Sequence, residues 1–162
     1  MTEINGLPAH VLFVHFLVVL VPLTALLVMV CAVWPAARRR LVWPTLILAA
    51  VITALTPITT DAGEWLFDLR RNPSPILREH AERGGWMIYF SVALLVVAIA
   101  LAVLHMIERR SDKRRVATKA ILATLAVAVG ISSMIQVYRI GDAGSQSVWA
   151  GEIARLKKAN GT

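Results

Sequence analysis

The sequence predicts an all-α integral membrane protein, a bundle of four transmembrane helices followed by a short interfacial C-terminal helix. Three observations predict this fold. The 162 residues are 57% hydrophobic, the mean hydropathy is +0.67, and the apolar residues gather in four runs separated by charged segments. Because a helix of about 20 apolar residues crosses a bilayer, the four runs account for most of one transmembrane domain, residues 1–162.

The first two runs predict spans at about residues 9–34 and 41–60. The first is almost unbroken apolar sequence, and it is too long and too poorly preceded by positive charge for a cleaved signal peptide. We therefore expect it to be retained. The second is shorter and contains Pro44 near its start and Pro57 near its end, so we expect a span with a polar outer third.

The third and fourth runs predict spans at about residues 86–107 and 116–138. Each contains at most one residue that can carry a charge, His105 or Lys119. Both of these lie close to a helix end, where a long side chain reaches the headgroup region at little cost.

Residues 61–85 are predicted to form an outer loop, in which Ser74 caps a short helix that has Pro75 at its first position. Residues 139–162 are predicted to form a C-terminal tail with a helix lying in the membrane interface. Apolar residues recur at helical spacing in this tail: Trp149, Ile153 and Leu156. Between the two halves of the chain we expect no internal repeat beyond their shared hydrophobicity.

Lysine and arginine are densest in two short connections, which predicts that these face the cytoplasm and that both termini lie outside. The residues are Arg38, Arg39 and Arg40, then Arg109, Arg110, Lys113, Arg114 and Arg115. The formal net charge of +7 is explained in the same way, because basic residues border the apolar runs and form no polar face of their own. We therefore expect a lipid bilayer and no nucleic acid as partner. A homo-oligomer stays an open alternative.

Polar side chains are concentrated in the predicted outer half of the bundle. The deepest that can carry a charge is His15, about 9 Å along the helix from Ala9, where an ionisable group needs a partner. Candidate ligands of a cofactor are His10, His15 and His80, and a polar vestibule is predicted from Thr56, Asp61, Glu64, Gln136 and Arg139. A site in this chain should therefore open to the outer side.

The histidines restrict the choice of ligand pairs. His10 and His15 are five residues apart, about 140° around a helix, so both cannot bind one metal ion without distortion. His105 lies about 37 Å along a continuous helix from His80 and is expected at the inner border. The remaining pairs are His15 with His80, or His10 with His80. The alternatives are histidines hydrogen-bonded at the interface and threonines bonded to their own helix carbonyls.

No nucleophile triad, phosphate-binding loop, zinc helix motif or cysteine-rich iron site is found in the sequence, so we do not expect an enzyme. Cys31 is the only cysteine. Neither a disulfide framework nor a cysteine metal cluster can be built from one thiol.

Four segments resemble a bacterial family of four-span membrane proteins catalogued as domain of unknown function 2231. They are GLPAHVLFVHFLVVLVPL (6–23), TPITTDAGEWL (56–66), HAERGGW (80–86) and YRIGDAGSQSVWAG (138–151). The resemblance covers nearly the whole chain and implies a multi-pass protein of the bacterial inner (cytoplasmic) membrane. In that family the position after Gly141 is often histidine, whereas this sequence has Asp142. Family members joined to iron–sulphur modules imply redox work.

Three functions stay open on this basis. The first is a b-type haem or other redox module of a membrane electron-transfer system, with axial histidines from facing helices. The second is a module that binds or transports a proton, an ion or a small solute through the polar vestibule. The third is a non-catalytic scaffold subunit with a membrane or redox protein partner. We rank haem binding first, with the cofactor itself unknown.

Overall fold

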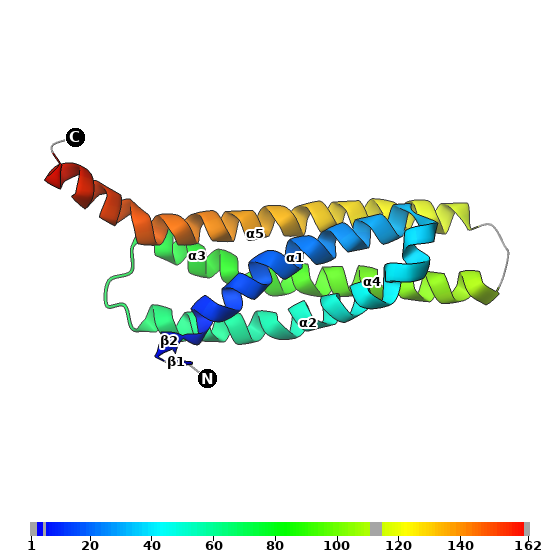
Figure 1. Ribbon diagram of the computed structural model, residues 1–162, viewed down its shortest axis with the longest axis horizontal. Helices are drawn as coiled ribbons and strands as arrows, with labels where there is room; N and C mark the ends of the chain where they lie inside the picture. The colour runs from blue at the N-terminus through cyan, green and yellow to red at the C-terminus, as the bar shows by residue number, and fades with distance from the viewer. Residues whose placement is uncertain (1–2, 5, 111–114, 161–162) are drawn as a thin grey trace.

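Helices form almost all of the protein in a computed structural model that describes residues 3–4, 6–110 and 115–160 (Figure 1). Four segments are long and apolar enough to cross a membrane: α1 (Ala9–Val33), α2 (Pro35–Asp68), α3 (Pro75–Gly85) continued by α4 (Met87–Arg110), and α5 (Val116–Ala159). The predicted all-α membrane bundle is confirmed. A two-residue ladder that the sequence did not predict, β1 (Glu3–Ile4) with β2 (Leu7–Pro8), precedes α1.

Helix α2 is longer at both ends than the predicted span, 41–60. It begins at Pro35, directly after a turn at Trp34, because proline suits the first helical position and alanine and arginine favour a helix. Arg38 therefore lies on α2 and not in a connection. Of the basic residues predicted for the second connection, Lys113 and Arg114 lie outside the described residues.

The predicted outer loop, 61–85, is mostly helical. Helix α2 continues to Asp68 and α3 begins at Pro75, so that only residues 69–74 join them. The predicted start of α3 is confirmed, because the Ser74 hydroxyl accepts a hydrogen bond of 3.2 Å from the Leu77 amide. This cap satisfies one of the amides that a helix start leaves without a partner.

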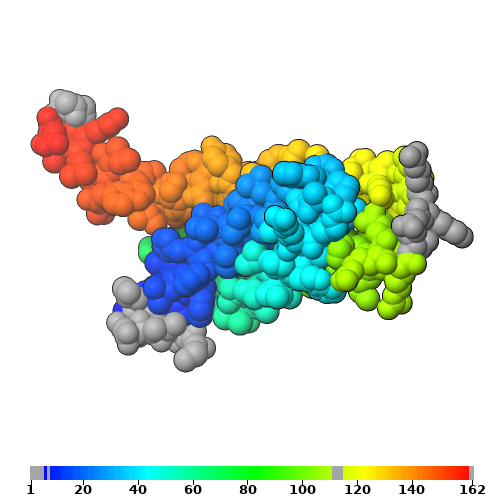
Figure 2. Space-filling model, turned by 45° about the vertical axis from the view of Figure 1, so that its right-hand side comes forward, coloured from blue at the N-terminus to red at the C-terminus, as the bar shows by residue number. Residues whose placement is uncertain are grey.

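The C-terminal tail, 139–162, is not a separate short helix. Its residues through Ala159 continue α5, which has 44 residues and, at about 1.5 Å per residue, is about 66 Å long. Since this exceeds the thickness of a bilayer, the last turns of α5 project beyond the other helices (Figures 1 and 2). That these turns lie in the membrane interface stays a prediction.

The core lies where small and branched residues of all four long helices meet, among them Ala25, Ala49, Leu94 and Ala126. Large apolar side chains also cover the outside, such as Val19 and Ile47, each 64% exposed. An outer surface this apolar is suited to lipid and not to water.

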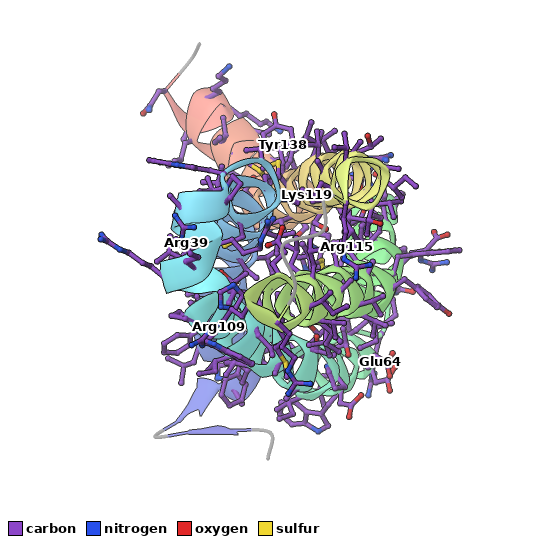
Figure 3. The ribbon with its side chains drawn as sticks, turned by 90° about the vertical axis from the view of Figure 1, so that its right-hand side faces the viewer. Arg39, Glu64, Arg109, Arg115, Lys119 and Tyr138 are labelled. Carbon is purple, nitrogen blue, oxygen red and sulfur yellow. The ribbon has the colours of Figure 1, made fainter. Side chains whose placement is uncertain are left out.

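Two polar regions lie at opposite ends of the bundle. The first, which we name the arginine end, consists of Arg38, Glu108 and Lys119, close to the turn between α1 and α2. Figure 3, viewed along the bundle from this end, shows Lys119 between the helix ends and Arg39 at their edge. The second lies at the end that carries both termini and α3 (Figure 1), and we name it the histidine end, for His10 and His80.

At the arginine end a buried ion pair joins the helices. The guanidinium of Arg38 is 1% exposed and lies 2.8 Å from the carboxylate of Glu108 on α4. It also donates a 3.0 Å hydrogen bond to the carbonyl of Cys31, in the last turns of α1. Lys119 of α5 lies 2.7 Å from the same carboxylate. One carboxylate thus links α2, α4 and α5, and through Arg38 also α1.

Candidate functional site

Two of the candidate histidines meet at the histidine end. His10 is the second residue of α1 and His80 lies in the middle of α3, and their ring centroids are 6.2 Å apart with the ring planes at 85°. The two side chains are 70 residues apart in sequence, so only the packing of α1 against α2 and of α3 against α5 brings them together.

Each of these rings is held by a hydrogen bond to a backbone carbonyl of a neighbouring helix. His10 Nδ1 lies 2.9 Å from the carbonyl oxygen of Thr59 on α2, and His80 Nδ1 lies 2.9 Å from that of Ile140 on α5. A carbonyl oxygen can only accept, so Nδ1–H donates in both bonds. In the neutral ring this is the tautomer with a bare Nε2, the nitrogen that can bind a ligand.

Helix α3 is fixed to α5 by further polar contacts beside His80. The side-chain amide of Gln136 donates a 2.8 Å hydrogen bond to the Arg83 carbonyl, and the guanidinium of Arg83 donates one of 3.2 Å to the Arg139 carbonyl. Arg83 also forms an ion pair with Glu79, one turn earlier on α3. Gln136 thus serves to hold the helix that carries His80.

A pocket lies against both rings. Its volume is about 50 Å³, and one side of it is open. Apart from His10, His80 and three threonines of α2, the lining is apolar and comes from α1, α3, α4 and α5. These other lining residues include Val14, Leu17, Val18, Met87, Val137 and Ile140.

The structure does not bring His15 to this pocket. His15 is exposed on another face of α1, where Nδ1 donates to the carbonyl of Val11 in its own helix and the ring lines a shallow pocket with Phe16 and Val19. His10 and His15 thus point in different directions, as their spacing of five residues requires. His105 is 5% exposed and lies one turn before Glu108, at the arginine end.

The predicted vestibule residues divide into two groups. Thr56 is fully buried and lines the pocket, but its hydroxyl donates to the carbonyl of Ile52 at 2.6 Å, which confirms the expectation that threonines of this helix bond to their own backbone. Asp61 and Glu64 are exposed, and Figure 3 shows Glu64 pointing outward from the bundle. The side chain of Arg139 is also exposed, and only its backbone carbonyl contributes to this region, as the acceptor of the hydrogen bond from Arg83.

Asp142, which follows Gly141 on α5, does not reach the pocket. Its side chain is exposed and accepts a 2.9 Å hydrogen bond from the side-chain amide of Gln146, one turn later on α5. The histidine that contacts this part of α5 is His80 of α3, which is hydrogen-bonded to the carbonyl of Ile140. In this chain Asp142 therefore supplies no ligand to the histidine pair.

Sequence analysis missed the residues beneath the rings. Gly63 of α2 lies under His10 and Gly144 of α5 under His80. A signal was present, because Asp-Ala-Gly occurs twice, at residues 61–63 and 142–144. This motif is shorter than the internal repeats that the expectation of no repeat concerned, and that expectation stays a prediction. The motif is easily overlooked, because three residues carry little weight against long apolar runs.

The site offers two ligands for a metal and no more. Within residues 3–4, 6–110 and 115–160, no group of three or more histidine, cysteine, aspartate or glutamate side chains lies close enough to hold a metal ion. A structural zinc site takes four protein ligands and a catalytic one takes three. A haem iron needs only axial ligands from the protein, and two facing histidines are sufficient for that.

Comparison with known proteins agrees with the resemblance seen in the sequence. The family model described as "Predicted membrane protein (DUF2231)" matches residues 6–156. Neither the curated proteins nor the solved structures gave a match. Because the family model covers nearly the whole chain, this protein belongs to the DUF2231 family of predicted membrane proteins.

Proposed function

We propose that this protein is a b-type haem carrier of a membrane electron-transfer system, with His10 and His80 as the two axial ligands. The observation that supports the proposal most directly is the distance of 6.2 Å between the ring centroids. Two imidazoles on opposite sides of one metal ion, each with a metal–nitrogen bond of about 2 Å, have centroids about 6 Å apart. In such an arrangement each ring can rotate about its metal–nitrogen bond, so the angle between the ring planes can take any value.

The hydrogen bonds of the two rings support the same proposal. A histidine that binds a metal usually donates its other ring N–H to a carboxylate or a backbone carbonyl, which sets the ring orientation and makes the ligand more basic. Both Nδ1 atoms have such a partner, the carbonyls of Thr59 and Ile140. The protein would therefore need no change of tautomer to bind iron through Nε2.

The lining of the pocket beside the pair suits an apolar cofactor. Apart from the two histidines and three threonines, it consists of apolar residues from helices on both sides. Because the pocket volume is only about 50 Å³, well below the roughly 300 Å³ of a small ligand pocket, most of a porphyrin would extend through its open side. A bound haem supplies one-electron transfer, while the residues of this chain hold it, orient it and keep water from it.

The membrane orientation belongs to this proposal. With the arginine-rich connections in the cytoplasm, the histidine end and both termini face the outer side of the bacterial inner membrane. The haem would then lie close to the outer surface, where a redox protein partner can approach. The absence of a second histidine pair on the inner half limits the chain to one haem, since the two other histidines, His15 and His105, lie on different helices and far apart in depth.

The test is an absorption spectrum of the detergent-purified protein from haem-replete cells, oxidised and then reduced with dithionite. The wild type should show a Soret band and sharp reduced bands of six-coordinate haem, and His10→Ala and His80→Ala should each abolish them. His15→Ala is the matched control, since it removes an exposed histidine of the same helix, and it should keep the spectrum. A folded, colourless wild type, or loss of the bands in His15→Ala alone, would overturn the proposal.

A second function is favoured by the size of the enclosed space. A cavity of about 50 Å³ holds one or two water molecules, and its polar lining is histidine and threonine, which suits a proton or a small cation. On this alternative the protein is a binding or transport module. It predicts a colourless protein whose thermal stability increases when one particular ion is added. This increase should be lost in His80→Ala.

A further inference from the structure

The two copies of Asp-Ala-Gly occupy the same structural positions in two different helices. In both, the aspartate is exposed and the alanine is buried, at 6% exposure for Ala62 and 2% for Ala143. In both, the glycine lies under a histidine ring that another helix supplies. The two halves of the site are therefore built in the same way, α1 on α2 and α3 on α5.

The hydrogen-bonded carbonyl has the same position relative to the glycine in each half. Thr59 lies four residues before Gly63, and Ile140 lies four residues before Gly144. Residues four apart in a helix lie one above the other on the same face. A side chain on the later residue would thus cover the approach to the carbonyl of the earlier one, and a glycine leaves that approach open.

The space at both glycines is too small for a methyl group. A Cβ atom on Gly63 would lie 2.8 Å from His10 Nδ1 and 2.9 Å from Cε1. A Cβ atom on Gly144 would lie 3.0 Å from His80 Nδ1 and 2.9 Å from Cε1. These separations are well below the roughly 3.5–4.0 Å at which nonbonded heavy atoms pack best. In each case the nitrogen affected is the one that donates to the carbonyl.

We propose that Gly63 and Gly144 are positioning residues for the two axial histidines, and that the repeated Asp-Ala-Gly segment marks this role. Each glycine lets the Nδ1–Cε1 edge of a ring approach the helix closely, donate Nδ1–H to the carbonyl four residues earlier, and present Nε2 to the shared ligand. The inference rests on the proposed haem function for the identity of the ligand. The hydrogen-bond geometry that it assigns exists with or without haem.

The chain supplies matched control glycines. Gly141 lies one turn before Gly144 on α5, and Gly85 ends α3; a Cβ atom on either would meet nothing within 4 Å. Gly141→Ala and Gly85→Ala therefore make the same chemical change as Gly63→Ala and Gly144→Ala without touching a histidine. All four changes favour helix formation in the same direction.

The first measurement needs no haem. Nitrogen-15 NMR of histidine-labelled, haem-free protein should show the Nδ1–H tautomer for His10 and His80, assigned with His→Ala variants. Gly63→Ala should lose this signature at His10 and keep it at His80, and Gly144→Ala should do the opposite. The unaffected ring thereby reports that each variant is folded. Both control variants should keep both signatures.

The second measurement is haem affinity and reduction potential. Loss of a hydrogen bond to a ligating histidine typically weakens metal binding about tenfold or more, so Gly63→Ala and Gly144→Ala should each bind haem at least about tenfold more weakly or shift its potential, and the controls should not. Unchanged tautomers with unchanged affinity would overturn the inference while leaving the haem proposal intact. If the glycine variants show the ring-specific tautomer changes but the wild type binds no haem, the positioning role is upheld and only the haem proposal is overturned.

Discussion

The two ends of the bundle use polar side chains in opposite ways. At the arginine end Arg38, Glu108 and Lys119 bind one another across three helices. At the histidine end His10 and His80 each bind one uncharged carbonyl, and within the described residues neither Nε2 has a hydrogen-bond partner. The ion pairs join the helices at the arginine end, although Arg38 Nε has no hydrogen-bond partner in the part of the chain that the structure describes. At the histidine end, by contrast, one nitrogen of each ring is left over.

The comparison predicts that stability depends mainly on the arginine end. Glu108→Ala leaves the buried guanidinium of Arg38 without a carboxylate, and breaking a buried pair in this way costs about 3–5 kcal/mol. Reversible unfolding in detergent micelles should show a loss of this size in the free energy of unfolding. Arg38→Met combined with Glu108→Met should recover most of it, because no buried charge is left unpaired. A loss below about 1 kcal/mol in Glu108→Ala would show that this pair behaves as a surface contact.

The same measurement at the histidine end should give a smaller effect. His10→Ala removes one hydrogen bond to a carbonyl that also belongs to the α2 helix, so haem-free protein should lose about 1 kcal/mol of unfolding free energy. Haem binding should nevertheless disappear. If His10→Ala lowered the unfolding free energy of haem-free protein as much as Glu108→Ala does, stability would depend equally on both ends. The His10 ring would then be a structural element.

Lys119 tests how far the arginine end extends toward solvent. Its side chain is 40% exposed and shares the Glu108 carboxylate with Arg38, so Lys119→Gln should reduce the unfolding free energy by about 0.2–1 kcal/mol. Salt should shrink this difference, because exposed pairs are screened. Arg38, at 1% exposure, should show no such salt dependence. Equal salt sensitivity at both positions would contradict the difference in burial.

The smallest effect is expected at Thr56. Its hydroxyl bonds to the carbonyl of its own helix, so Thr56→Val should change the unfolding free energy by about 0.5 kcal/mol or less and leave the haem spectrum in place. The measurement also separates the two proposed functions. A proton or cation site that uses this hydroxyl would lose its ion-dependent stabilisation in Thr56→Val, whereas a haem site ligated by His10 and His80 would not respond.

Much of the fold could be predicted from the sequence because its signals are local. Apolar run length predicted the four spans, and Ser74 followed by Pro75 predicted the start of α3. Helix ends were predicted less well. The polar residues 61–68 and 139–159 suggested a loop and a separate tail, yet both segments continue a helix, since polar residues in a helix beyond the bilayer give no periodic apolar signal.

The candidate site was predicted only in part. His10, His15 and Gln136 were found because polar residues in apolar runs stand out, and His80 was found as the one histidine of the predicted outer loop. The roles of the Thr59 and Ile140 carbonyls could not be found, since every residue has a carbonyl and only packing decides which one is approached. The same holds for Arg38, which was expected in a connection and is buried against Glu108, 70 residues later in the chain.

The sequence by itself determined that this is a four-span helical membrane protein of its family, because a bilayer imposes length and hydropathy on each span separately. The tertiary structure alone decided which histidine faces which. His10 and His15 point about 140° apart around α1, and the packing of α1 against α2 and α5 decides which of the two rings faces into the bundle. His10 thus lies beside His80, over a glycine that the packing of two helices placed beneath it.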